Sequence, residues 1–68
     1  MIIILNGENK QVDSSTNIEQ LLQAIGLSDK RLAVEVNEQI IPRSEFSGTA
    51  LKESDKVEIV QAIGGGSF

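Results

Sequence analysis

The sequence predicts an α+β domain in which a mixed sheet of about five strands carries one main helix on one face. Three features lead to this fold class: an Asn-Gly hairpin signal near the start, a single capped amphipathic stretch, and later β-rich segments. A hairpin followed by a helix that crosses to another strand implies a mixed sheet with the helix packed over it. The 68 residues make one domain.

The first two strands are expected before residue 13. Residues 2–5, "IIIL", form a β-branched run that suits a central strand. Asn6-Gly7 follows this run and is a strong signal for a two-residue hairpin turn. The second strand is predicted over Lys10–Val12 and depends on that turn for its assignment.

The helix is predicted over Asn17–Ile25. Thr16 and Glu19 have the spacing of a capping box. Four apolar residues then repeat at the i, i+3, i+4, i+7 spacing of one helix face: Ile18, Leu21, Leu22 and Ile25. Gly26 stands where a left-handed residue ends a helix, and Leu27 supplies the hydrophobic contact that accompanies such an ending.

The remaining strands follow a polar turn. Residues 32–37, "LAVEVN", alternate, and three of them are expected to face the core: Leu32, Val34 and Val36. Ile40-Ile41 can form only a short edge strand, because Pro42 cannot donate a backbone hydrogen bond. A single helical turn that starts at Pro42 would place the side chain of Phe46 in the core. The last strand is predicted over 57–63, beside the first strand at the centre of the sheet.

Composition narrows the function. Without cysteine or histidine, the chain lacks cysteine nucleophiles, thiolate metal ligands, the usual general base and the commonest metal ligand. The carboxylates are scattered, and the sequence itself places no two of them together. A net charge of −4 argues against nucleic acid as a partner. The apolar start is too short for a signal peptide or a membrane span, so we expect a soluble cytoplasmic protein with no metal site and no membrane partner.

The chain ends with "QAIGGGSF". Glycine has no side chain to bury, so residues 1–63 are assigned to the folded domain and residues 64–68 to a flexible, glycine-rich tail. A frayed end, a linker or a hinge would each account for such a tail. The functional alternative is a thin arm, at most roughly 10 Å long over three glycines, that enters an enzyme channel too narrow for any Cβ atom.

Four segments resemble the ThiS family of sulfur carriers. They are "ILNGE", "TNIEQLLQAIGL", "LAVEVNEQIIPRSEF" and "VEIVQAIGGG", and together they cover nearly the whole chain. The most specific parts are the Val-Asn-x-x-Ile-Ile-Pro-Arg run and the terminal diglycine. The resemblance implies the ubiquitin-like β-grasp fold and a role as a sulfur carrier in the biosynthesis of the thiazole part of thiamine.

The resemblance also implies partners and a reaction. An E1-like, ThiF-type adenylyltransferase would use ATP and magnesium to adenylate the C-terminal glycine carboxylate. Sulfur from cysteine, delivered through a cysteine desulfurase, would replace AMP to give a thiocarboxylate, and a ThiG-type thiazole synthase would accept it. Gly65 and Gly66 match the diglycine of the family, and Gly66 matches the residue that bears the acyl group. Gly64 precedes them in the tail. The chain would then be a protein cosubstrate, with no catalytic residue and no bound cofactor.

Ser67 and Phe68 depart from the family pattern. With them attached, Gly66 is held in an amide, which cannot be adenylated as a carboxylate can. They are expected to be removed, as in ubiquitin precursors, and the alternatives are a cloning remnant or an inactive copy. Three other functions stay open: a MoaD-like carrier for molybdopterin synthesis, a ubiquitin-like protein modifier, and a plain interaction domain.

Partner docking is expected on the sheet face away from the helix. If the first and last strands turn alternate residues toward the helix, the others form an outward aliphatic patch beside the root of the tail. The members of this patch are Ile2, Ile4, Val60 and Ala62. Exposed apolar patches on small domains usually mark interfaces.

Overall fold

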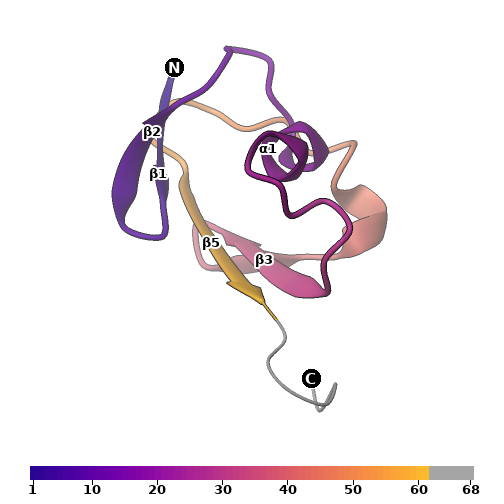
Figure 1. Ribbon diagram of the computed structural model, residues 1–68. Helices are drawn as coiled ribbons and strands as arrows, with labels where there is room; N and C mark the ends of the chain where they lie inside the picture. Colours follow the sequence, from indigo (N-terminus) through magenta and orange to yellow (C-terminus); the bar gives the residue numbers. More distant parts are fainter. Residues whose placement is uncertain (62–68) are drawn as a thin grey trace.

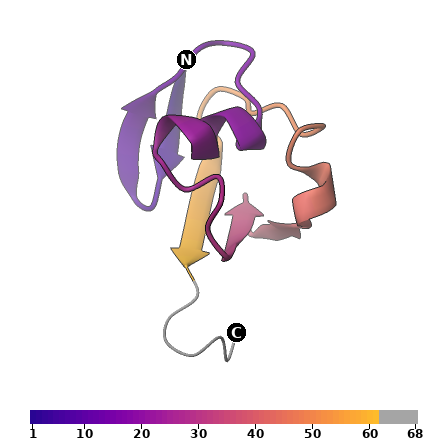
Figure 2. The same ribbon diagram turned by 45° about the vertical axis from the view of Figure 1, so that its right-hand side comes forward.

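A computed structural model describes residues 1–61. In this part of the chain the elements are β1 (Ile2–Leu5), β2 (Glu8–Gln11), α1 (Ile18–Ala24), β3 (Leu32–Val36), β4 (Gln39–Ile41), the short 3₁₀ helix η1 (Arg43–Glu45) and β5 (Lys56–Gln61). The strand order is β2-β1-β5-β3-β4, with β1 parallel to β5 and the other neighbours antiparallel. The helix α1 lies over one face of this sheet (Figures 1 and 2). The predicted fold class is confirmed, including the adjacent first and last strands.

The β1–β2 hairpin starts its second strand earlier than predicted. Asn6 and Gly7 both have positive φ, 49° and 85°, as a tight two-residue turn requires. Because only two residues turn the chain, pairing resumes at once with Glu8 opposite Leu5. The predicted strand over Lys10–Val12 therefore begins two residues too late and ends one residue too far.

The helix is capped one residue later than predicted. Asn17 Oδ1 accepts the Gln20 N–H at 2.8 Å, and Gln20 Oε1 accepts the Asn17 N–H at 3.0 Å, so these two residues form the capping box. The predicted box of Thr16 and Glu19 is wrong. The Thr16 carbonyl instead accepts the Leu51 N–H at 2.9 Å, which keeps Thr16 in the connection before the helix.

The end of the helix confirms the sequence prediction. Gly26 has a left-handed backbone, with φ of 79°. Its N–H donates to the Gln23 carbonyl at 3.2 Å, and the Leu27 N–H donates to the Leu22 carbonyl at 2.8 Å. These two bonds make a Schellman motif, which satisfies carbonyls that the helix leaves unpaired.

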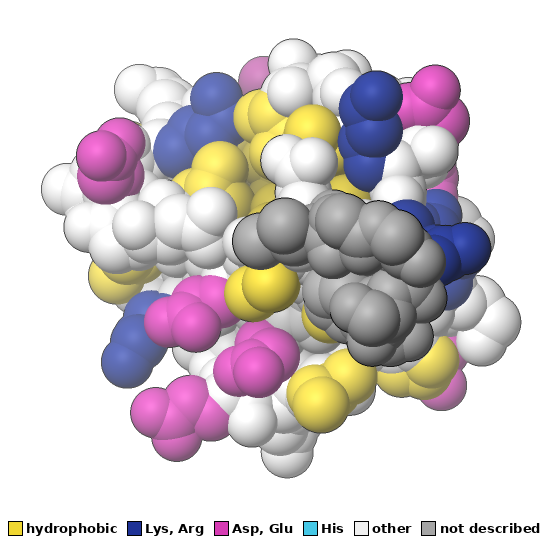
Figure 3. Space-filling view, turned by 60° about the horizontal axis from the view of Figure 1, so that its bottom comes forward, with side chains coloured by type: hydrophobic (Ala, Val, Ile, Leu, Met, Phe, Trp, Pro, Cys, Tyr) yellow, Lys and Arg dark blue, Asp and Glu magenta, His cyan; other side chains and the backbone are white. Residues whose placement is uncertain are grey.

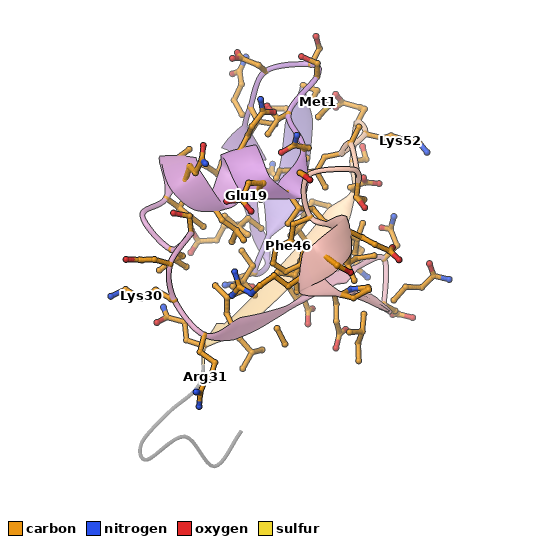
Figure 4. All side chains as sticks on the ribbon, turned by 90° about the vertical axis from the view of Figure 1, so that its right-hand side faces the viewer. Met1, Glu19, Lys30, Arg31, Phe46 and Lys52 are labelled. Atoms are coloured by element: carbon orange, nitrogen blue, oxygen red, sulfur yellow. The ribbon has the colours of Figure 1, made fainter. Side chains whose placement is uncertain are left out.

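The core is aliphatic around one aromatic ring. Its buried members are Ile3, Ile18, Leu21, Leu22, Val34, Phe46, Leu51, Val57 and Ile59. Phe46, directly after η1, points into the interior as predicted (Figure 4). Arg43 covers this ring at 5.5 Å from its centroid and donates to the Lys30 carbonyl at 2.7 Å. This cation therefore ties η1 to the loop after the helix.

Gly26 and Gly48 offer a matched test of the helix ending. An added Cβ meets no atom within 4 Å at Gly26, so Gly26→Ala changes only the cost of the left-handed backbone. We expect a loss of about 1–2 kcal/mol in the free energy of unfolding, measured by urea denaturation. Gly48→Ala, whose Cβ would make an ordinary contact at 3.9 Å, is the control and should cause no comparable loss. Equal losses for both variants would contradict this account of Gly26.

Candidate functional site

The central strand β5 leads toward the predicted functional segment. Its pairing with β3 extends to Gln61, which lies opposite Leu32. Its pairing with β1 is much shorter and ends at Val57, opposite Leu5. Beyond Val57, therefore, β1 supplies no further partner for the edge of β5 that faces it.

The side chain of Asn6 continues the pairing where β1 ends. The Asn6 N–H donates to the Val57 carbonyl at 2.9 Å. Its Oδ1 accepts the Ile59 N–H at 2.8 Å, and its Nδ2 donates to the Ile59 carbonyl at 3.4 Å. The amide thus replaces a strand residue and holds the second half of β5 in the sheet.

Asn37 has the same role at the opposite end of β5. Its N–H donates to the Lys56 carbonyl at 2.8 Å, and its Oδ1 accepts the Lys56 N–H at 3.0 Å. Its Nδ2 donates to Asp55 Oδ1 at 3.0 Å, while Asp55 Oδ2 accepts the Lys52 N–H at 2.8 Å. Both turns that carry these asparagines therefore hold β5 in place.

The alternation of β5 separates an inward from an outward face. Val57 and Ile59 are buried, and Val60 is 56% exposed on the outward side. Ile3 is fully buried, so its neighbours Ile2 and Ile4 also point outward, where both are half-buried. The predicted orientation of Ile2, Ile4 and Val60 is confirmed, whereas their role in partner binding stays a prediction.

The predicted sulfur-carrying segment is not part of the described structure. Six site residues lie outside residues 1–61: Ala62, Gly64, Gly65, Gly66, Ser67 and Phe68. The tail boundary, the identity of the reactive carboxylate and the removal of the last two residues therefore stay predictions.

Strand register brings together residues that the sequence left apart. Glu35 of β3 lies directly opposite Glu58 of β5, and Ile40 of β4 lies opposite Glu35 on its other side. Ile40 is 72% exposed. Figure 3 shows acidic and hydrophobic side chains side by side at this end of the molecule. Alternation along each strand predicts the outward direction, but only the register shows which side chains are neighbours.

Two other kinds of feature, a metal centre and a membrane-spanning helix, have no counterpart among the described residues. Within residues 1–61, no group of three histidine, cysteine, aspartate or glutamate residues could hold a metal ion. No helix of this part is long and apolar enough to cross a membrane. A hollow of about 300 Å³ lies between β2 and α1, with buried Leu21 among its lining residues. The outward sheet face beside the end of β5 is thus the candidate site that agrees with the sequence prediction.

The fold and the position of this face define a class of protein. The domain has a mixed five-stranded sheet with one helix across it, and the central strand of the sheet leads to the C-terminal segment. This is the ubiquitin-like β-grasp arrangement. The model of the ThiS family matches residues 3–66. The chain belongs to the ThiS family.

Individual relatives agree with this assignment. The chain is 33% identical to a crystal structure of a thiamine biosynthesis protein, ThiS, from Geobacter metallireducens, with a TM-score of 0.83 over 97% of this chain and 100% of that one. It is 35% identical to the sulfur carrier protein ThiS of Bacillus subtilis, over 91% of this chain and 96% of the relative. It is also 40% identical, over 98% of its own length, to a thiazole synthase of Paramagnetospirillum magneticum. The chain spans 21% of the length of that thiazole synthase.

The bonds of Asn6 can be tested without disturbing its backbone. Asn6→Gly keeps the positive φ accessible but removes both side-chain bonds to Ile59. We expect a loss of about 1–2 kcal/mol in the free energy of unfolding. Amide hydrogen exchange should quicken at Ile59 more than at Glu58 and Val60, whose N–H groups face β3. Uniform changes at all three amides would contradict a local role for Asn6.

Proposed function

We propose that this domain is a sulfur carrier in thiamine biosynthesis and that its working group is the carboxylate of Gly66. The observation that carries the proposal is the match of the ThiS family model, which covers nearly the whole domain and has Gly66 as its last matched residue. A relative from Bacillus subtilis, matched over 96% of its own length, is named as a sulfur carrier protein. The domain serves as a protein cosubstrate and not as an enzyme.

The proposed reaction follows hydrolysis of the amide bond between Gly66 and Ser67, which frees the Gly66 carboxylate, and it then has two steps. In the first, the Gly66 carboxylate attacks the α-phosphate of ATP on a ThiF-type adenylyltransferase, which supplies magnesium, and pyrophosphate leaves. The resulting acyl-adenylate is needed because a free carboxylate is a poor electrophile. In the second, the terminal sulfur of a persulfide formed by a cysteine desulfurase forms a bond to the acyl carbon, and the bond to AMP breaks. A thiol reductant then cleaves the S–S bond of the resulting acyl disulfide, and a thiocarboxylate remains. The attacking carboxylate is already ionised at neutral pH, so the chain needs no general base, which fits its lack of histidine and cysteine.

A thiazole synthase is the proposed acceptor of the sulfur. Two relatives of this chain, 40% and 38% identical to it, are named thiazole synthase. These names favour thiazole formation over the alternatives of a MoaD-like carrier or a protein modifier. The reaction would take place in the cytoplasm, where ATP is available.

The outward sheet face is the proposed docking surface for the adenylyltransferase. Val60 is exposed one residue before the end of described β5, and Ile4 points to the same side from β1. Asn6 and Asn37 hold β5 in a fixed position in the sheet. An enzyme that binds this face therefore meets the end of β5 in a fixed position.

The proposed chemistry predicts a mass change that depends on the last two residues. The 68-residue chain and a version ending at Gly66 are incubated with the adenylyltransferase, ATP and a sulfur source, and intact masses are measured. The Gly66-terminated form should gain the mass of one oxygen-to-sulfur exchange, and the full chain should gain none. Modification of the uncut chain at Phe68 would refute the assignment of Gly66. Lysine adducts of the Gly66-terminated form in cells, without a free thiocarboxylate, would indicate a protein modifier.

Charged substitutions in the docking face should block adenylation without unfolding the domain. Val60→Glu and Ile4→Glu place a carboxylate on a surface that must lose its water when the enzyme binds. We expect at least a roughly tenfold fall in kcat/KM for adenylation of the Gly66-terminated form. The circular dichroism spectrum should be retained. Ser44→Glu, an exposed position in η1, adds the same charge elsewhere and is the control. Unchanged kinetics for both test variants would exclude this face as the docking surface.

A further inference from the structure

The outward face holds two carboxylates directly opposite each other. Antiparallel pairing sets Glu35 of β3 against Glu58 of β5. Side chains in such positions have Cβ atoms about 4.5–5.5 Å apart, and like charges there destabilise a sheet. Glu58 is exposed and Glu35 is half-buried. The pair therefore lowers the stability of the free domain.

Aliphatic side chains frame this pair. Ile40 lies opposite Glu35 on the side away from Glu58, and Ala33 and Val60 form the next row toward the end of β5. Ile40 and Val60 are the large hydrophobic side chains that are exposed within the described residues, at 72% and 56%. A protein surface that covers them would also remove the adjacent carboxylates from bulk water, where an unpaired charge is costly.

We propose that the adenylyltransferase places one cationic side chain, an arginine, between Glu35 and Glu58 while its apolar surface covers Val60 and Ile40. This inference rests on the proposed function and adds the chemistry of the partner at the docking face. The planar guanidinium can donate to two carboxylates at once, which suits a cross-strand pair. Its attraction to them strengthens when the surrounding apolar side chains exclude water.

The negative charge of the outward sheet face disfavours two other partners, a second copy of this chain and a phosphate-rich molecule. A second copy of this chain, docked through the same face about a two-fold axis, would bring four carboxylates together, and the net charge of −4 would add to the repulsion. A phosphate-rich partner would be repelled for the same reason. Lys56 lies on this face beside Glu58 along β5 and opposite Ile4, but a single cation leaves the two glutamates with an excess negative charge.

Removal of one carboxylate should affect the free domain and the complex in opposite directions. Glu58→Gln relieves the repulsion, so the Tm of the free domain should rise by roughly 1–8 °C. Its affinity for the adenylyltransferase should fall about tenfold. Glu58→Lys should raise the Tm as well, because it faces Glu35, and should weaken binding about a hundredfold, because it opposes the arginine. A residue with a structural role alone would change the Tm of the free domain and its affinity for the adenylyltransferase in the same direction.

The experiment uses the Gly66-terminated domain and a purified ThiF-type adenylyltransferase. Calorimetric titration gives Kd, ATP–pyrophosphate exchange reports adenylation, and thermal unfolding gives the Tm for Glu58→Gln, Glu58→Lys and Glu35→Gln. Glu8→Gln is the matched control, since it removes the same charge from an exposed position in edge strand β2. We expect its Kd to equal that of the wild type.

The outcomes separate this inference from the proposed function. The paired-carboxylate site is overturned if the wild-type domain is adenylated normally and the Kd of Glu58→Lys lies within about twofold of the wild-type Kd. That result would leave the proposed carrier function standing. Equal weakening by Glu8→Gln and Glu58→Gln also overturns it, because net charge and not the pair would then control binding. Failure of the wild-type Gly66-terminated domain to be adenylated overturns both proposals.

Discussion

The hydrogen bonding of β5 along its two edges is the constraint on which the rest of the domain depends. β5 lies at the centre of the sheet, with β3 along one side and the shorter β1 along the other. Where these neighbours end, the side-chain amides of Asn6 and Asn37 take over the pairing. The two sheet halves, β2-β1 and β3-β4, are thereby joined through a single strand, and that strand leads to the C-terminal segment. The same bonds stabilise the fold and hold the strand that precedes the segment proposed to carry sulfur.

The core needs no tryptophan or tyrosine, because it lies between a single helix and one face of a small sheet. Three fully buried helix residues, Ile18, Leu21 and Leu22, meet the inward residues of β1, β3 and β5. Phe46 fills the remaining side, where the sheet ends at the short strand β4. In the described structure no helix covers the opposite face of the sheet (Figures 1 and 2).

The uncovered face is the docking surface for the adenylyltransferase in both the proposed function and the further inference. Its aliphatic residues lie next to the end of β5, and its two facing glutamates lie within the same rows of side chains. In the free domain this arrangement is unfavourable, since it exposes hydrophobic groups and opposes like charges. Both features become favourable against a partner with an apolar surface and one cation. If both proposals hold, the sheet face lowers the stability of the isolated domain and raises the selectivity of binding.

Patterns in the sequence predicted the fold class, the helix ending at Gly26, the inward positions of the strands and the place of Phe46. These follow from local rules: the spacing of apolar residues and the backbone freedom of glycine act over a few residues. The helix cap was misplaced by one residue because Thr16 and Asn17 are both competent caps, and the bond from the Leu51 N–H to the Thr16 carbonyl separates them. Two other contacts become visible only in the folded chain: the Asn6 amide completes the pairing of β5, and Glu35 lies opposite Glu58. Such contacts join residues distant in the chain, and their partners depend on strand register, which local patterns do not specify.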